Sequence, residues 1–334
     1  MAKNENQLNN PQSALITPIQ VALSSPLKAR TRSTVSRPPV GVALIPDEAT
    51  DTSPQHSPIG FDFLTGNNDG TLSRLTRGKG AIATGAPVQL IFWGSVWNSP
   101  ISPSASQIIS SVQNILDGPF MSGLLQYGIN RSPFRGAIVV TSPEPPFAPN
   151  TFDADDLEDE LIGALIDGGA FPEPDEDGGR NIYVVVMPPN TKYNGDPKIK
   201  GAHSHFNSGS LIDVDNTWYA WIGNADIDLM TRVFGHELAE TCTNPEGDGW
   251  TVDGEPDGEN EIGDVCTKRT NQVNGITLDG YWSQLDNACL LPTEYSLKRF
   301  MLSSGLDPTK GLRPVMLPPP PLPQFFSLRA LMKI

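Results

Sequence analysis

Apolar residues gather in short runs through the middle of the chain, and glycine or proline bounds most of these runs. Runs of this length and composition predict buried strands. They are PVQLIFW at 87–93, GAIVVTS at 136–142 and NIYVVVMPP at 181–189. Two further segments, AHSHF at 202–206 and TWYAWIG at 217–223, are also short enough to be strands.

A second pattern, with apolar positions three or four residues apart, predicts helices between the strands. The first helix carries its apolar face at Ile108, Ile109, Val112, Ile115 and Leu116. Ser102 is its predicted N-cap, with Pro103 at the first helical position, and Ser104 is the alternative cap. A second helix is predicted over 153–166, where acidic residues in the first turn complement the helix dipole.

A third helix begins at Asn224 or Asp226 and is ended by Pro245. The predicted order is therefore strand, helix, strand, helix, strand, strand, strand, helix. This order is similar to that of zincin-type zinc peptidases, in which two helices pack on a twisted mixed sheet and the second helix carries the metal motif. We predict an α/β (α+β) fold with a single zincin-like domain.

The two ends of the chain differ in composition from this middle part. Residues 1–77 are rich in Ser, Thr, Pro and Asn, and they predict a disordered arm or linker, because such a segment buries too little apolar surface to offset chain entropy. The ordered domain is expected over 78–306. Residues 307–334 form a Pro-rich tail that ends in the short amphipathic segment FFSLRALMKI.

Charge and length narrow the classes of partner. The net charge of -15 argues against nucleic acid or an anionic membrane as the main partner, because phosphate binding needs a basic surface. No stretch of about 18 apolar residues is present, so no transmembrane helix is expected. The N-terminus, MAKNENQLNNPQSALITPIQ, is polar and has no apolar segment of the kind found in secretory signals.

The third helix contains GHELAETCTNP at 235–245, and with it an HExxE motif. Residues four apart lie on one face of a helix, so His236 and Glu240 can offer a nitrogen and an oxygen to one metal ion. Glu237 is offset from this pair and can reach a water on the metal as a general base, as in HExxH enzymes. The competing interpretation is a satisfied buried histidine, with Glu237 and Glu240 facing solvent.

A third ligand is needed, and ENEIGDVC at 259–266 offers two candidates. We favour Asp264. Glu261 is as plausible on spacing alone, and it could instead accept a hydrogen bond from His236. His203 is the other option, either as a ligand or, if AHSHF is an edge strand, as a donor to a developing oxyanion. His203, His205 and His236 fall within 34 residues of one another, which favours a shared site.

Other chemistry has less support. The segment DGEPDGENE at 253–261 lacks the spacing of an EF-hand loop, so calcium is a weak alternative to zinc. No GxSxG motif is present for a serine hydrolase. Cys242 lies more than a turn and a half beyond His236, which is a poor geometry for a Cys-His pair.

A set of motifs in this order resembles the EXORDIUM, or phosphate-induced protein, family and above all its bacterial relatives. The matching segments are FWGSVWNSP (92–100), GAHSHF (201–206), TWYAWIGN (217–224), GHELAETCTNP (235–245), GW (249–250), EIGDVC (261–266) and GYWSQLDNAC (280–289). The resemblance singles out six residues: His203, His236, Glu237, Glu240, Glu261 and Asp264. It also implies a disulfide between Cys266 and Cys289, which would contribute about 3 kcal/mol.

The family resemblance implies a secreted or cell-surface protein, although this chain shows no recognisable secretory signal. Members of the family in plants are linked to growth signalling. They carry extra cysteines near the segment that corresponds to GAHSHF, where this chain has Lys200 and polar residues.

Three functions follow as expectations. The first is a zinc-dependent hydrolase of the peptidase class, with metal on His236, Glu240 and Asp264, Glu237 as base, and a peptide or protein substrate along the edge strand. The second is a non-catalytic extracellular binding or growth-signalling module that keeps a structural metal. The third, ranked last, is carbohydrate recognition by Trp250, Tyr281 and Trp282.

Overall fold

The computed structural model describes residues 19–22, 41–44, 75–142, 144–145, 150–172, 174, 180–194, 196–207, 216–223, 225–252, 260–266, 270–284 and 288–291. Most of the arm predicted over 1–77, and the tail predicted over 307–334, lie outside these residues. None of the helices in the described ranges combines the length and the apolar composition that crossing a bilayer requires.

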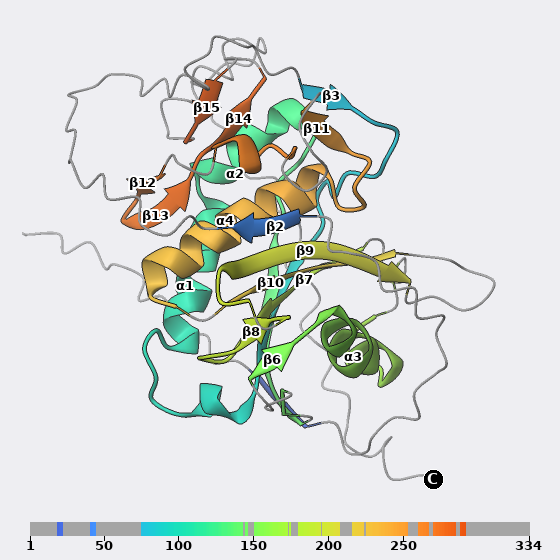
Figure 1. Ribbon diagram of the computed structural model, residues 1–334, viewed down its shortest axis with the longest axis vertical. Helices are drawn as coiled ribbons and strands as arrows, with labels where there is room; N and C mark the ends of the chain where they lie inside the picture. The colour runs from blue at the N-terminus through green and yellow to red at the C-terminus, as the bar shows by residue number, and fades with distance from the viewer. Residues whose placement is uncertain are drawn as a thin grey trace, which may run out of the picture. The chain divides into compact units, whose positions relative to one another are not determined.

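A seven-stranded mixed sheet forms the centre of the fold (Figure 1). In spatial order its strands are β1 (Ile19–Ala22), β5 (Phe134–Ser142), β4 (Val88–Trp93), β7 (Ile182–Val186), β10 (Asn216–Ile222), β9 (Ile199–Asn207) and β2 (Gly41–Leu44). The strands from β1 to β10 run parallel, and β9 runs antiparallel to both of its neighbours. All five strands predicted from apolar runs or length are confirmed, as β4, β5, β7, β9 and β10.

Strands β1 and β2 lie within 1–77, for which composition predicts no secondary structure. Their sequences, IQVA and GVAL, are short apolar runs that complete the two edges of the sheet. As a result β9 is not an edge strand, which corrects the expectation for AHSHF. Residues with strong β-propensity pair where a sheet offers unpaired backbone groups, whatever the composition around them.

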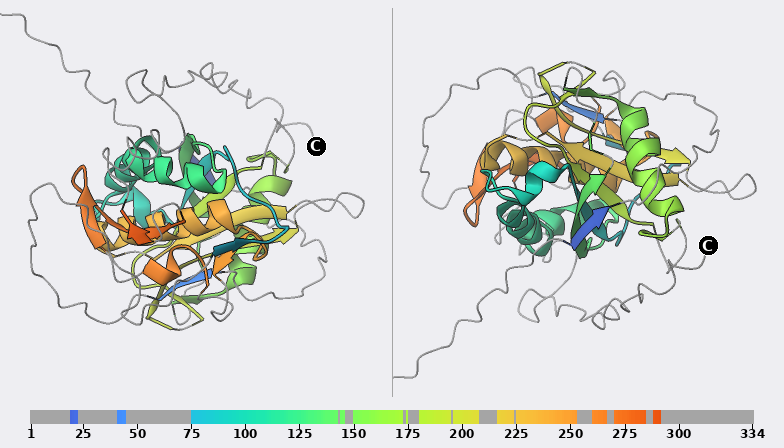
Figure 2. Two further views of the ribbon diagram at one scale, coloured as in Figure 1. Left: turned by 90° about the horizontal axis from the view of Figure 1, so that it is seen from above. Right: turned by 90° about the horizontal axis from the view of Figure 1, so that it is seen from below.

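Helices cover both faces of the sheet (Figures 1 and 2). Helices α1 (Ala105–Asp117) and α4 (Ile227–Thr243) pack on one face, in a core that includes Leu90 and Val184. The segment formed by η3 (Asp156–Gly163) and α3 (Ala164–Asp167) packs on the other face, against Ile91 and Val185. The fold is therefore mixed α/β, with a mixed sheet packed by helices, as predicted.

The ends of these helices decide between the predicted caps. Ser104 caps α1: its hydroxyl accepts the backbone N–H of Gln107 at 3.3 Å, and the Gln107 side chain accepts the N–H of Ser104 at 2.8 Å. The prediction of Ser102 as cap and Pro103 at the first helical position is wrong, because the reciprocal pair of Ser104 and Gln107 satisfies two backbone amides and starts the helix two residues later. The helix predicted over 153–166 is present, and Asp226 caps α4.

Smaller elements complete the fold. They are β3 (Leu75–Arg77) paired with β11 (Trp250–Val252), β6 (Thr151–Phe152) with β8 (Lys192–Tyr193), β12 (Thr270–Val273) with β13 (Ile276–Asp279), β14 (Tyr281–Ser283) with β15 (Ala288–Leu290), and the short helices η1 (Ser95–Asn98), α2 (Pro119–Gly123), η2 (Leu124–Tyr127) and η5 (Asp264–Cys266).

The disulfide between Cys266 and Cys289, implied by the family resemblance, is present and ties η5 to β15. Tyr281 and Trp282 are buried, and the Tyr281 hydroxyl donates to the carbonyl of Phe120 at 2.6 Å. These aromatic side chains therefore belong to the core, which removes the main support for a carbohydrate platform.

Candidate metal centre

The rotation of helix α4 about its own axis is fixed by its N-cap and by contacts with strand β13. Asp226 accepts a backbone N–H of the first turn at 2.8 Å. Arg232 donates to both carboxylate oxygens of Asp279, at 2.9 and 3.3 Å. At Gly235 an added Cβ would lie only 2.8 Å from Leu278, so the helix and the hairpin approach closely here. These contacts direct the HExxE residues inward.

All three charged residues of the motif are buried. The side chains of His236, Glu237 and Glu240 are 3%, 1% and 0% exposed. The interpretation in which the two glutamates face solvent is therefore wrong. A buried carboxylate needs a compensating partner, because its loss of hydration is otherwise too costly.

One possible set of metal ligands is formed by His236, Glu240 and Asp264. Nε2 of His236 lies 3.1 Å from Oε1 of Glu240 and 3.5 Å from Oδ1 of Asp264. These are the three residues favoured as ligands from the sequence, and the fold brings them together from α4 and η5.

A tight turn over 260–266 delivers Asp264 to the helix. The backbone N–H of Asp264 donates to Oε1 of Glu240 at 3.1 Å, and the N–H of Trp282 donates to the carbonyl of Ile262 at 2.8 Å. A Cβ added at Gly263 would lie 2.6 Å from Oε1 of Glu240 and 2.8 Å from Nδ1 of His236. Only glycine therefore lets the turn come this close to the motif.

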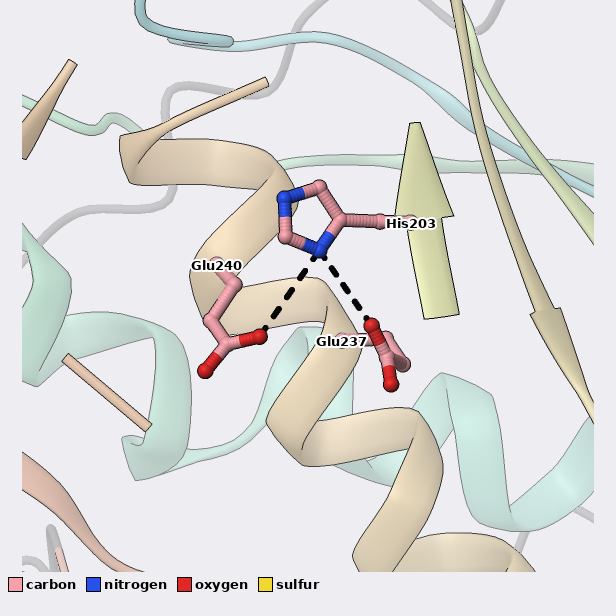
Figure 3. A group of neighbouring side chains, drawn as sticks. All are labelled: His203, Glu237 and Glu240. Carbon is pink, nitrogen blue, oxygen red and sulfur yellow. Dashed lines mark hydrogen bonds and ion pairs between the residues drawn. The ribbon is translucent and has the colours of Figure 1, made fainter. Parts of the chain in front are cut away.

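A second set of possible ligands shares Glu240 and adds His203 and Glu237 (Figure 3). On β9, Gly201, His203 and His205 occupy alternate positions and so share one face of the strand, the face that looks toward α4. Nδ1 of His203 lies 3.3 Å from Oε2 of Glu237 and 3.7 Å from Oε2 of Glu240. The two oxygens of Glu240 are thus directed to different histidines.

Glu261 lies on the far side of the His203 ring. Nε2 of His203 is 3.5 Å from Oε1 of Glu261 and 3.3 Å from the carbonyl oxygen of Asn244. The Asn244 amide in turn donates to Oε1 of Glu261 at 2.5 Å and accepts the N–H of Gly249 at 2.6 Å. The hypothesis that Glu261 accepts from His236 is therefore wrong, because Glu261 faces His203 instead.

The cluster carries more negative than positive charge. It contains four carboxylates, on Glu237, Glu240, Glu261 and Asp264, and two imidazoles. In the part of the chain that the structure describes, these carboxylates form ion pairs with the two histidines alone. Four minus charges against at most two plus charges leave a net charge of about -2, unless protons or a cation make up the difference.

The pKa values respond to this imbalance. Burial raises the pKa of Glu237, and it raises that of Glu240 well above its usual range, where the nearby carboxylate of Asp264 adds to the effect. Burial alone would lower the pKa of His203, but the carboxylates of Glu261 and Glu237 outweigh it and raise the pKa to about 10. Metal binding to Glu240 therefore competes with protonation of this carboxyl group.

The His236 set fits a divalent metal ion in two respects. Ligand atoms bound to a tetrahedral zinc ion at 2.0–2.1 Å lie about 3.3 Å apart, which matches the 3.1 and 3.5 Å measured here. Among the described residues, Nε2 of His236 is buried and makes no hydrogen bond; Oε2 of Glu240, which faces His203, is likewise buried without one. Such atoms are rare in folded proteins and are a common sign of a ligand site. The buried groups could therefore hold a metal ion.

Cys242 takes no part in this cluster. Its thiol is fully buried beside Ser132, with Sγ and Oγ 3.8 Å apart, and burial raises its pKa to about 12. A thiol that stays protonated is a poor nucleophile and a poor ligand. This agrees with the poor Cys-His geometry expected from the sequence.

Sequence reasoning missed three residues that shape the site. Gly201 and Gly263 make room for Glu237 and Glu240, and Asn244 links the end of α4 to Glu261. Asn244 stands directly before Pro245, the residue that marks the helix end, and this position was the available signal. Most of the proposed calcium segment, residues 253–259, lies outside the described residues.

Comparison of the chain with protein-family models, with curated protein sequences and with solved structures finds no match.

Proposed function

We propose that the protein is a zinc-dependent hydrolase of the zincin type that cleaves peptide bonds. The observation that carries the proposal is the set formed by His236, Glu240 and Asp264, whose ligand atoms are spaced as around a tetrahedral ion. One imidazole and carboxylates are ligands that zinc accepts. When bound, zinc would act as a Lewis acid toward a carbonyl group and lower the pKa of a water molecule.

Glu237 is the proposed general base. It follows the ligand His236 in sequence, and among the described residues its Oε1 is buried without a hydrogen bond, so this oxygen can accept a proton. Its other oxygen faces Nδ1 of His203 at 3.3 Å. An ion pair on one carboxylate oxygen fixes the direction of the other.

His203 has a different proposed role from the one expected. Both of its ring nitrogens already face partners, Glu237 on one side and Asn244 with Glu261 on the other. An oxyanion donor needs a free N–H directed at the substrate. We therefore assign His203 to positioning Glu237 rather than to binding an oxyanion.

The non-catalytic alternative would use a structural metal, and the burial of the cluster favours it. Structural zinc sites are closed by four protein ligands, whereas catalytic sites keep one position open. Within the described residues, each candidate set has three members, and the two histidines belong to different sets. A set of three protein ligands leaves one position open, so it supports the hydrolase over the closed structural site.

Peptide cleavage by the zinc-loaded chain tests the proposal. A mixture of synthetic peptides is incubated with the protein and the products are identified by mass spectrometry. Glu237→Gln should retain zinc and lose about 100-fold or more in rate, because it removes the base and keeps the ligands. Glu160→Gln, an exposed change on η3, should cleave like the wild type. Zinc binding without peptide cleavage would favour the structural-metal module. The same absence of cleavage is required of a variant in which strand β2 no longer pairs with β9 and the edge of the sheet is open to the peptide.

A further inference from the structure

Strand β2 occupies the outer edge of β9, next to helix α4 (Figure 1). It runs antiparallel to β9, with Gly41 opposite His203, Val42 opposite Ala202 and Ala43 opposite Gly201. It also contacts α4. A segment from the N-terminal part of the chain thus lies where β9 comes closest to the candidate centre.

Without β2, strand β9 would be the edge of the sheet on this side. An exposed edge presents a row of unpaired N–H and C=O groups that accept another extended chain. His203 projects from this strand toward Glu237 and Glu240, so a chain paired with β9 passes beside the acidic cluster. The edge is therefore a suitable place for an extended polypeptide to reach Glu237.

The pairing of β2 is short. It covers four residues, and Pro39 and Pro46 stand close on either side in sequence. Proline lacks the N–H that a ladder needs, so the pairing does not extend easily in either direction. Residues 45–74 separate β2 from β3 in the sequence.

We infer that residues 41–44 act as an internal competitor at the outer edge of β9, where an extended polypeptide substrate would pair antiparallel to β9. This inference rests on the proposed function for its substrate class. A peptide substrate binds by displacing β2, so the full chain is held in a state of reduced activity that loss of β2 from the edge relieves.

A proline pair tests the inference in the full chain. In Val42→Pro, Ala43→Pro two adjacent amides are lost, so at least one ladder donor is removed whichever way the strand alternates. Val42→Thr, Ala43→Thr keeps both amides and β-propensity and is the matched control. Binding of a labelled synthetic peptide that copies residues 38–47 is followed by fluorescence anisotropy. The amide exchange of Gly201 to His203 and the zinc content are measured on the same samples.

The proline pair should bind the peptide at least about tenfold more tightly than the wild type and exchange the β9 amides faster, with zinc content unchanged. The threonine pair should behave like the wild type. Equal peptide affinity and equal exchange in all three proteins would overturn the inference. Peptide binding without any cleavage would leave the binding edge in place and remove the proposed hydrolysis. Equal cleavage by the wild type and the proline pair would keep the proposed hydrolysis and exclude β2 as a competitor of the substrate.

A locking variant covers the case in which the proline pair does not fold. Val42→Cys, Ala202→Cys places two thiols at positions that face one another in register. Oxidation should lower peptide binding by about tenfold or more, and mild reduction should restore it, while the wild type treated in the same way does not change. Peptide binding that is the same in the oxidised and reduced forms would contradict displacement of β2.

Discussion

Nε2 of His236 lies 3.1 Å from Oε1 of Glu240, one helical turn further along α4. Four-residue spacing places both groups on one face of the helix, and the turn that carries Gly263 closes over them. The pair is buried, and Nε2 of His236 makes no hydrogen bond among the described residues. Two buried polar groups arranged in this way are stabilised when a cation lies between them.

Substitutions at Glu240 should show whether zinc binding needs a ligand atom at this position or only the negative charge. Glu240→His places a second imidazole one turn from His236, as in HExxH, and should retain zinc. Glu240→Leu removes the ligand and should weaken zinc affinity by about 100-fold or more. Titration with a zinc-sensitive chromophore measures both affinities. Equal affinity of Glu240→Leu and wild type would exclude Glu240 as a ligand.

Gly263→Ala should disturb the centre while leaving the rest of the fold intact. The added Cβ would lie 2.6 Å from Oε1 of Glu240, so the carboxylate or the turn must shift. We expect a loss of about tenfold or more in zinc affinity. Gly168→Ala is the matched control, because Gly168 is exposed and has right-handed helical backbone angles (φ -77°). A metal site unaffected by Gly263→Ala would show that this turn does not position the ligands.

Zinc binding should release protons. Burial raises the pKa of Glu240 well above its usual range, so metal binding to this carboxyl group competes with its protonation. Metal binding needs the deprotonated ligand, so the affinity should rise with pH. Isothermal titration calorimetry in buffers of different ionisation enthalpy counts the protons released. No dependence of the observed enthalpy on the buffer would contradict the account.

Loss of the disulfide between Cys266 and Cys289 should act on both stability and metal binding. The bridge spans 23 residues in sequence, and its removal should cost about 3 kcal/mol in the free energy of unfolding. Asp264 stands two residues from Cys266, so its position should loosen as well. Urea unfolding of Cys266→Ser, Cys289→Ser gives the first effect and zinc titration the second. The phosphine reductant TCEP should destabilise the wild type, whereas the double variant should not respond.

Much of the fold could be predicted from local patterns. The apolar runs predicted β4, β5 and β7, and helical spacing with a capping residue predicted α1 and α4. The strands β1 and β2 could not be predicted, because four-residue runs such as GVAL carry no signal until a distant edge such as that of β9 is available. Pairing between segments far apart in sequence depends on the assembled sheet.

The residues of the candidate centre could likewise be predicted only in part. Spacing within a helix indicated His236, Glu237 and Glu240, since it depends on local geometry alone. The partner of Glu261 could not be derived, because His203 and Asn244 meet it only after β9 and the end of α4 pack together. Gly201 and Gly263 were missed for the same reason: a close approach between elements leaves no local pattern.

The metal content of the purified full-length protein, measured by inductively coupled plasma mass spectrometry, tests the central claim most directly. The wild type, Glu237→Gln and His203→Gln should each carry about one zinc per chain, and His236→Gln should carry almost none. This pattern would assign the ion to His236, Glu240 and Asp264. Loss of zinc in His203→Gln with retention in His236→Gln would move the site to the other set. A wild type that takes up no metal from excess zinc would contradict the account.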